Sequence, residues 1–331
     1  MNAKEVLLSA RNLEVHFAIG KHILPSRRPR LKAVNGIDVD VYRGETLGIV
    51  GESGCGKSTL ARALLRLIEP TRGELRWKGE DMRGFDKKAL VRRRREFQMV
   101  FQDPTASLNP RLTVSECIAE PLLTHEPGLQ RREIERRVIA MMDKVGLSAS
   151  QRNRYPHEFS GGQCQRVGIA RALILNPDLV VCDEPVSALD VSIQAQVINL
   201  LDDLKQEMGL TLVMIAHDLS VVRHISDRVM VMYLGKPMEV GLYDRVFDQA
   251  QHPYTKALLS AVPIANPRLA RQREVQLLPG DLPSPLNPPS GCVFRTRCPE
   301  ATDLCGSQPP TQSGSDEHHI FCSNTLLLAG Q

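Results

Sequence analysis

One eight-residue segment restricts the fold of this chain more than any other feature. Residues 51–58 read GESGCGKS and fit the pattern G-x-x-x-x-G-K-[ST], in which a glycine-rich turn ends in lysine and serine. The apolar run Thr46–Val50 before this segment predicts a short buried strand. Leucines recur after it at helical spacing until Pro70, so the segment is predicted to join a strand to a helix.

This turn has the chemistry of a phosphate-binding site. Glycines let the backbone fold around an anion so that successive N–H groups point inward, and the start of the following helix adds a favourable field. In such loops the lysine, here Lys57, reaches the β- and γ-phosphates, and the serine hydroxyl, here of Ser58, ligates magnesium. The loop by itself predicts binding of a nucleoside triphosphate, without specifying the class of protein.

The chain up to about residue 265 alternates predicted strands and helices. Leu179–Cys182 and Thr211–Ala216 read as buried strands, and an amphipathic helix with apolar residues from Val197 to Met208 lies between them. Strands separated by helices indicate a parallel α/β sheet. Ten of the 22 prolines fall in residues 263–310, and this shift in composition predicts a loop-rich segment after a domain boundary near residue 265.

An acidic pair follows the predicted strand Leu179–Cys182. Ligands of open α/β sheets bind at the carboxyl edge of the strands, where Asp183 and Glu184 would emerge. Asp183 is therefore a candidate magnesium partner, and Glu184 is a candidate to orient or deprotonate an attacking water. The alternative is an acidic pair that serves as a turn or a helix cap.

A second predicted anion site lies in the middle of the chain. Residues 159–163 read FSGGQ, and Ser160, Gly161 and Gly162 open a predicted helix from Gln165 to Leu175. Two phosphate-binding helix starts in one chain suggest that each serves a different nucleotide.

These motifs together resemble the ATP-binding-cassette (ABC) ATPases, whose signature is Leu-Ser-Gly-Gly-Gln. The resemblance extends from about Leu8 to Leu259, and this chain departs from the signature only in the apolar Phe159. Gln102 matches the family's Q-loop, Asp190 its D-loop and His217 its switch histidine. Alone, Gln102 could be a solvated loop residue, Asp190 a helix cap and His217 a strand-end histidine. Their shared order and spacing favours the family.

The resemblance implies a P-loop NTPase of α/β class. We expect a parallel-sheet RecA-like core, an N-terminal antiparallel β subdomain and an inserted α-helical subdomain at about residues 105–175. These parts would form a nucleotide-binding domain over residues 1–265. A Pro- and Cys-rich C-terminal extension would occupy residues 266–331.

The resemblance also implies an ATPase that works as a head-to-tail nucleotide sandwich. Glu184 would act as general base with His217 and Gln102 as further catalytic residues, and magnesium would be held by Ser58, Gln102 and Asp183. The residues implied to bind ATP within the chain are Phe17, Gly51, Ser53, Gly54, Cys55, Gly56, Lys57, Ser58 and Thr59. Those implied to contact the partner's ATP are Ser160, Gly161, Gly162, Gln163 and Asp190. Phe17 would stack on adenine, although it could equally be a core residue, and the insertion Gly20–Arg30 follows it.

Several segments resemble a narrower group, the ATPase subunits of bacterial oligopeptide/dipeptide importers. The segments are 101–104, 107–110, 155–160, 184–192 and 252–255, with the tail residues 282–285 and 291–292. That family pairs two different ATPase subunits beneath two membrane-spanning permease subunits, which receive peptide from an extracytoplasmic binding protein. The resemblance implies a peripheral protein on the cytoplasmic face of the inner membrane, and the N-terminus does not read as a secretory signal.

Other functions remain open at this point. The importer could serve dipeptides or a related substrate such as nickel, or the chain could energise an exporter. A soluble cassette acting on nucleic acid would explain the arginine run 92–95, but the net charge is only +4 and such runs are commonly solvated helix faces. We therefore expect no nucleic-acid partner.

Four cysteines are concentrated near the C-terminus. Cys292, Cys298, Cys305 and Cys322 lie in a segment too short to build its own core, and four thiolates suit zinc or an iron–sulfur cluster. Their spacing is wider than in common zinc motifs, and the resemblance to peptide importers implies a 4Fe-4S cluster. The alternatives are four reduced, uncoordinated cysteines, or substitution of a ligand by His318 or His319.

Overall fold

The computed structural model describes residues 5–20, 29–262, 276–315 and 317–324. The chain forms two compact units, each assembled from separate stretches of sequence. Of the described residues, unit 1 contains 5–8, 41–46 and 76–216, and unit 2 contains 9–20, 29–40, 47–75, 217–262, 276–315 and 317–324. The predicted boundary near residue 265 and most of the insertion after Phe17 lie outside the described residues.

Unit 1 is built on parallel strands connected by helices. Strands β6, β7 and β8 pair in parallel, with Val100 opposite Cys182 and Asp183 opposite Ile215. All residues of β7 and β8 are buried, as expected for strands covered on both faces. Its elements are β5 (Glu80–Asp81), η2 (Met82–Gly84), α2 (Lys87–Arg93), β6 (Phe97–Val100), α3 (Pro104–Ser107), α4 (Val114–His125), α5 (Arg131–Lys144), η3 (Ala149–Gln151), η4 (Pro156–Glu158), α6 (Gly161–Leu173), β7 (Leu179–Asp183), α7 (Val191–Met208) and β8 (Thr211–Ile215).

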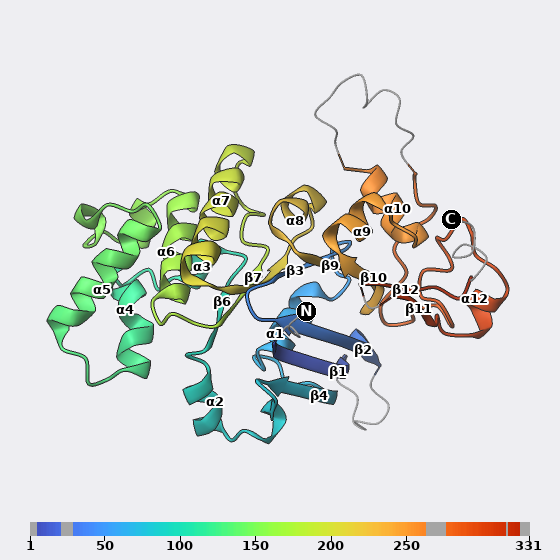
Figure 1. Ribbon diagram of the computed structural model, residues 1–331, viewed down its shortest axis with the longest axis horizontal. Coiled ribbons are helices and arrows are strands. Elements are labelled where there is room, and N and C mark those ends of the chain that lie inside the picture. Colours follow the sequence, from blue (N-terminus) through green and yellow to red (C-terminus); the bar gives the residue numbers. More distant parts are fainter. Residues whose placement is uncertain (1–4, 21–28, 263–275, 316, 325–331) are drawn as a thin grey trace. The chain divides into compact units, whose positions relative to one another are not determined.

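The inserted segment of unit 1 is helical. Helix α4 packs against both α5 and α6, and α3 also contacts α6 (Figure 1). Thr113 and Glu116 form a reciprocal capping box that fixes where α4 begins. These helices cover the range 105–175 in which the sequence predicts a helical subdomain.

Unit 2 combines a parallel strand pair with antiparallel neighbours. Strand β3 lies parallel to β9, β9 continues antiparallel to β10, and a separate sheet has the order β2-β1-β4. The elements centred in this unit are β1 (Val6–Ala18), β2 (Arg30–Tyr42), β3 (Thr46–Val50), α1 (Lys57–Leu64), β4 (Arg72–Trp77), α8 (Leu219–Ile225), β9 (Arg228–Tyr233), β10 (Lys236–Leu242), α9 (Tyr243–Asp248), α10 (Pro253–Ser260), α12 (Leu304–Ser307), β11 (Gln312–Ser315) and β12 (His318–Phe321).

The helix after the phosphate loop is shorter than the sequence pattern predicts. Leucine spacing predicts a helix that continues to Pro70, whereas α1 ends at Leu64. Arg66 adopts a left-handed backbone with φ of 49°, which terminates the helix. Leu67 and Ile68 therefore lie in the turn that follows, where their amides donate to the Arg62 carbonyl.

The C-terminal segment contains more regular structure than its composition predicts. Strand β12 pairs antiparallel with β10, placing Ile320 opposite Glu239, and β11 adds a further strand. His318 on β12 lies 2.7 Å from Glu239, whose side chain is fully buried. The segment thus extends the sheet of unit 2 and needs no core of its own.

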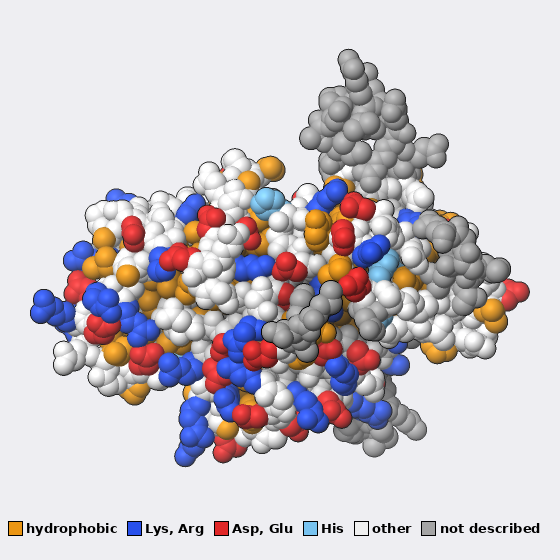
Figure 2. All heavy atoms as spheres, in the orientation of Figure 1, with side chains coloured by type: hydrophobic (Ala, Val, Ile, Leu, Met, Phe, Trp, Pro, Cys, Tyr) orange, Lys and Arg blue, Asp and Glu red, His pale blue; other side chains and the backbone are white. Residues whose placement is uncertain are grey.

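Charged side chains of both signs are interspersed on the face shown in Figure 2. Within the arginine run, Arg93 pairs with Glu80 and Glu96 and Arg95 pairs with Glu126, so acidic partners compensate part of its charge.

Among the residues that the structure describes, no helix has the length and apolar character needed to cross a membrane.

Candidate nucleotide-binding site

Backbone geometry explains why the loop between β3 and α1 is rich in glycine. Gly51 and Gly56 have φ values of 151° and 106°, in a range that L side chains rarely adopt. A Cβ on Gly51 would lie 2.1 Å from the Met232 carbonyl oxygen, and one on Gly56 would lie 2.0 Å from that of Ala33. Only glycine fits at both positions, because the obstructing atoms belong to the backbone.

Lys57 begins α1 and turns back over the loop. Its Nζ donates to the carbonyl oxygens of Gly51 and Glu52, at 2.8 Å and 3.1 Å, and the residue is only 4% exposed. Burial raises the pKa of the Cys55 thiol, which fits a small packing residue better than a reactive one.

Two predicted catalytic side chains meet in unit 1. Gln102 follows β6, Glu184 follows β7, and the Gln102 amide donates from Nε2 to Glu184 Oε2 at 3.0 Å. Glu184 has a left-handed backbone with φ of 47°, held by a hydrogen bond from its amide to the Ile215 carbonyl. Such a conformation costs about 1–3 kcal/mol and is frequent at functional sites. Asp183, the last residue of β7, is completely buried.

The predicted signature lies at the start of α6, earlier than the helix start that the sequence predicts. Ser160 is its N-cap, and Ser160 and Gln163 form a capping box through each other's backbone amide and side chain. Ser160 and Gly161 are exposed. Asp190, the N-cap of α7, belongs to the same unit and is also exposed.

The remaining predicted nucleotide residues belong to unit 2. His217 and Phe17 are both exposed, and 37% of Phe17 is accessible near the end of β1. This exposure suits the predicted stacking on adenine better than the alternative of a core position. Ser53 and Gly54 at the tip of the loop are likewise exposed, whereas Ser58 and Thr59 are half-buried.

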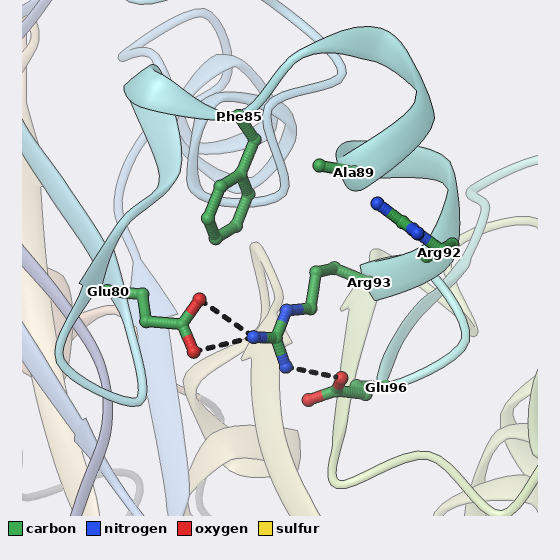
Figure 3. Close-up of a pocket in the computed structure, with 6 residues that line it drawn as sticks. All are labelled: Glu80, Phe85, Ala89, Arg92, Arg93 and Glu96. Carbon is green, nitrogen blue, oxygen red and sulfur yellow. Dashed lines mark hydrogen bonds and ion pairs between the residues drawn. The ribbon is translucent and has the colours of Figure 1, made fainter.

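A pocket of about 310 Å³ lies elsewhere in unit 1 (Figure 3). The Arg93 guanidinium bridges two carboxylates inside it, those of Glu80 and Glu96. Phe85, Ala89 and Arg92 complete its lining. The described residues that line this pocket do not include a predicted nucleotide residue.

The four C-terminal cysteines are all within the described residues. They occur as thiols, and the Cys292 amide donates to the Cys305 carbonyl at 2.8 Å. Among the described residues, however, no group of three or more His, Cys, Asp or Glu side chains is arranged to hold a metal ion. The structure therefore does not support the predicted iron–sulfur or zinc site.

Two residues that contact the phosphate loop were not predicted. Tyr254 accepts a hydrogen bond from the Glu52 amide at 3.0 Å, and Arg297 donates to the Glu52 carboxylate. Both lie about 200 residues or more from the loop in the sequence, so spacing arguments could not find them. The available signals were the segment 252–255, which contains Tyr254, and an arginine beside Cys298 in an otherwise Pro-rich segment.

Comparison with known proteins defines the class first. A family model described as "ABC transporter" matches residues 34–187. An ATP-binding cassette solved as a dimer with ADP and phosphate is 29% identical, with a TM-score of 0.65, and covers 72% of this chain and 99% of its own. A cassette of Clostridium perfringens from an ABC transporter complex is 26% identical, also with a TM-score of 0.65, over 74% of this chain and 92% of its own. The predicted ABC ATPase fold is thereby confirmed.

The relatives narrow the class to a family. A second model, "Oligopeptide/dipeptide transporter, C-terminal region", matches residues 238–305. The oligopeptide transport ATP-binding protein OppF of Salmonella typhimurium is 59% identical over 96% of both chains. OppF of Haemophilus influenzae is 56% identical over 98% of this chain and 99% of its own, and the dipeptide transport protein DppF of that organism is 50% identical over 96% of both chains. The chain belongs to the family of ATP-binding subunits of oligopeptide/dipeptide ABC transporters.

Proposed function

We propose that this protein is the ATPase subunit that energises import of oligopeptides across the bacterial inner membrane through a binding-protein-dependent ABC transporter. One observation carries the proposal: 59% identity to an oligopeptide transport ATP-binding protein over 96% of both chains. The intact set of nucleotide motifs supports the ATPase part of this proposal, because a relative that does not hydrolyse ATP would not need them.

The phosphate loop supplies the binding step. Its backbone amides bind the triphosphate. Lys57 Nζ then gives up a hydrogen bond to a loop carbonyl and binds the β- and γ-phosphates instead. Lys57 is already confined by burial and by two hydrogen bonds, so little side-chain entropy remains to be lost on binding. The remaining ATP contacts are those predicted for Phe17 and for loop residues Ser53 to Thr59.

The acidic end of β7 supplies the hydrolytic step. Glu184 acts as the general base that accepts a proton from the attacking water, and the Gln102 amide holds its carboxylate in place. His217 steadies the γ-phosphate and the water. The contribution of the protein is positioning and electrostatic stabilisation.

Magnesium supplies charge neutralisation of the phosphates when it is bound with ATP. The proposed ligands are oxygen atoms of Ser58, Gln102 and Asp183, the donor type that magnesium prefers. Gln102 uses its amide nitrogen on Glu184, so its amide oxygen is the atom assigned to the metal.

A partner chain completes each nucleotide site in this proposal. Ser160, Gly161, Gly162 and Gln163 contact the ATP of the partner, together with Asp190. Exposure of Ser160, Gly161 and Asp190 supports that role. We propose that the partner is a paralogous ATPase subunit, and that the pair docks beneath two transmembrane permease subunits served by an extracytoplasmic peptide-binding protein.

We propose peripheral attachment to the cytoplasmic face of the membrane through the permease, as the similarity to transporter ATP-binding subunits suggests. We also propose the domain division given by the sequence, with a nucleotide-binding domain at 1–265 and an extension at 266–331. The match of the second family model to residues 238–305 supports a specialised C-terminal region.

Dipeptide import is the second candidate function. The 50% identity to a dipeptide transport protein over 96% of both chains favours it over nickel import or export. Action on nucleic acid is disfavoured by the ion pairs of the arginine run, since paired guanidinium groups are less available to phosphates.

We also propose a 4Fe-4S cluster, or zinc, as a cofactor bound by the four C-terminal cysteines. Concentration of the cysteines in one segment supports it, although the side chains as placed do not form a metal site. Iron, sulfide and zinc analysis of protein purified without oxygen tests it. Absence of all three from a fully folded sample would remove the proposal.

Transport itself tests the proposed function. We expect that deletion of this protein abolishes uptake of labelled oligopeptides while the binding protein still binds them. Restoration by the wild-type chain but not by Lys57→Ala would assign the defect to the nucleotide site. Undiminished oligopeptide uptake, or loss of dipeptide uptake alone, would overturn the oligopeptide assignment.

A further inference from the structure

The C-terminal segment that contains the four clustered cysteines contacts the phosphate loop through the ion pair between Arg297 and Glu52. Nη1 of Arg297 donates to both carboxylate oxygens of Glu52, at 3.0 Å and 2.8 Å. The two side chains are only 11% and 27% exposed, so water screens this pair less than a surface pair. Burial lowers the pKa of Arg297, but hydrogen bonds, first that to Glu52, raise it on balance.

Aromatic packing fixes the position of Arg297. Phe294, three residues earlier, is completely buried and lies 5.3 Å from the Tyr233 ring and 5.2 Å from the Tyr254 ring. The Arg297 amide donates to the Phe294 carbonyl at 3.0 Å, and its guanidinium lies 6.0 Å from the Tyr233 ring. Burial of Phe294 and the backbone hydrogen bond between these two residues therefore hold Arg297 beside the loop.

Glu52 is the point where three contacts to the loop converge. Its amide donates to Tyr254 Oη, its carbonyl accepts from Lys57 Nζ and its carboxylate accepts from Arg297. Fixing Glu52 thus fixes one of the two carbonyls that position Lys57. An uncompensated carboxylate in this loop would also repel a triphosphate.

We propose that Arg297 is a positioning residue for ATP binding, which holds Glu52 and compensates its charge so that the loop and Lys57 accept the triphosphate. The inference rests on the proposed function of the loop as an ATP site. It gives the C-terminal segment a direct part in nucleotide affinity.

The test is titration of the full-length chain with Mg-ATP. We expect Arg297→Gln to weaken ATP binding about tenfold, within the range of losing one charge-assisted hydrogen bond. Arg297→Lys, which keeps the charge, should recover most of the affinity. The double variant Arg297→Gln/Glu52→Gln should bind ATP more tightly than Arg297→Gln, because it removes the uncompensated carboxylate.

Matched controls separate this role from general destabilisation. Arg295→Gln changes an arginine of the same segment that bonds Ser290, and should leave ATP affinity unchanged. Lys57→Ala should abolish ATP binding; if it does not, the proposed function fails. If Lys57→Ala abolishes binding while Arg297→Gln matches the wild type, only the positioning role is overturned.

The double variant decides between charge compensation and mere support of the fold. Equal weakening in Arg297→Gln and in the double variant would overturn the proposal, because lost packing is not restored by neutralising Glu52. If Arg297→Gln does not fold, the comparison of Arg297→Lys with Glu52→Gln takes its place. If Arg297→Lys and Glu52→Gln both bind ATP within threefold of the wild-type affinity, the role of charge balance is supported. A tenfold loss of ATP affinity in Arg297→Lys would refute it.

Discussion

Two adjacent glycines of the signature differ in the space that a Cβ would have, and alanine substitutions separate them. A Cβ on Gly162 would lie 2.6 Å from Cγ2 of Ile193 on α7, whereas one on Gly161 would lie at an ordinary 3.4 Å from Cδ2 of Leu189. The Ile193 methyl is attached to a β-branched carbon with one preferred rotamer in a helix, so it cannot easily move aside. Gly162→Ala must therefore push α6 and α7 apart.

The size of the effect follows from two opposing terms. Overpacking of a core contact costs about 1–3 kcal/mol, and replacing glycine by alanine in a helix returns up to about 1 kcal/mol. Gly162→Ala is therefore expected to lower the free energy of unfolding by up to about 3 kcal/mol, and to be about 1–3 kcal/mol less stable than Gly161→Ala. Gly161→Ala should leave it unchanged or raise it by up to about 1 kcal/mol.

Urea unfolding of the full-length chain measures these differences. Ile193→Ala removes the obstructing methyl, so in a double-mutant cycle Gly162→Ala should cost at least about 1 kcal/mol less in the Ile193→Ala background. Additive effects of the two substitutions would refute the packing argument. Equal stability of Gly161→Ala and Gly162→Ala would refute it as well.

Three further predictions concern single residues. Glu184→Gln should retain ATP binding, nearly abolish turnover and accumulate ATP-bound dimers; near-normal ATPase activity would exclude Glu184 as the base. Burial lowers the pKa of His252 to about 4, so its neutral form stabilises the fold above pH 6.5, and that contribution, about 3 kcal/mol in all, is lost as the pH falls from 6.5 through 4. Denaturation at several pH values should show a weaker acid dependence in His252→Asn, which can still cap α10; an unchanged slope would contradict this. Asp178 contacts Arg43 at 2.7 Å and Lys78 at 2.9 Å, so Asp178→Asn should cost about 1 kcal/mol in low salt and less in 1 M salt; a salt-independent loss would argue against a charge effect.

The local pattern of the chain predicts several strands and helices close to their observed bounds. β3 has the predicted bounds Thr46–Val50, and α7 ends at Met208 before Gly209, which adopts the left-handed conformation of a C-cap. The helix after the phosphate loop is shorter than predicted, because leucine spacing continues beyond the residue at which the backbone turns. Arg66 has a left-handed backbone although arginine rarely adopts one, so the residue type did not predict the end of the helix.

The sequence names candidate site residues one by one, but it does not predict the contacts that support them. Gln102 and Glu184 are 82 positions apart and still meet, as expected when parallel strands end at one edge of a sheet. The contacts of Tyr254 and Arg297 with Glu52 depend on aromatic packing between distant segments, and neither periodicity nor motif spacing carries such information. The C-terminal strands were missed for a related reason, since β11 and β12 are short and acquire their order by pairing with β10.

ATP hydrolysis and labelled oligopeptide uptake, measured on the same proteoliposomes containing the assembled transporter, test the central claim most directly. The account predicts that wild-type transporter couples the two activities, that Glu184→Gln in this subunit lowers both together, and that Lys57→Ala removes its ATP binding and the uptake. Oligopeptide uptake that persists at the wild-type rate with Lys57→Ala would show that this chain does not drive transport.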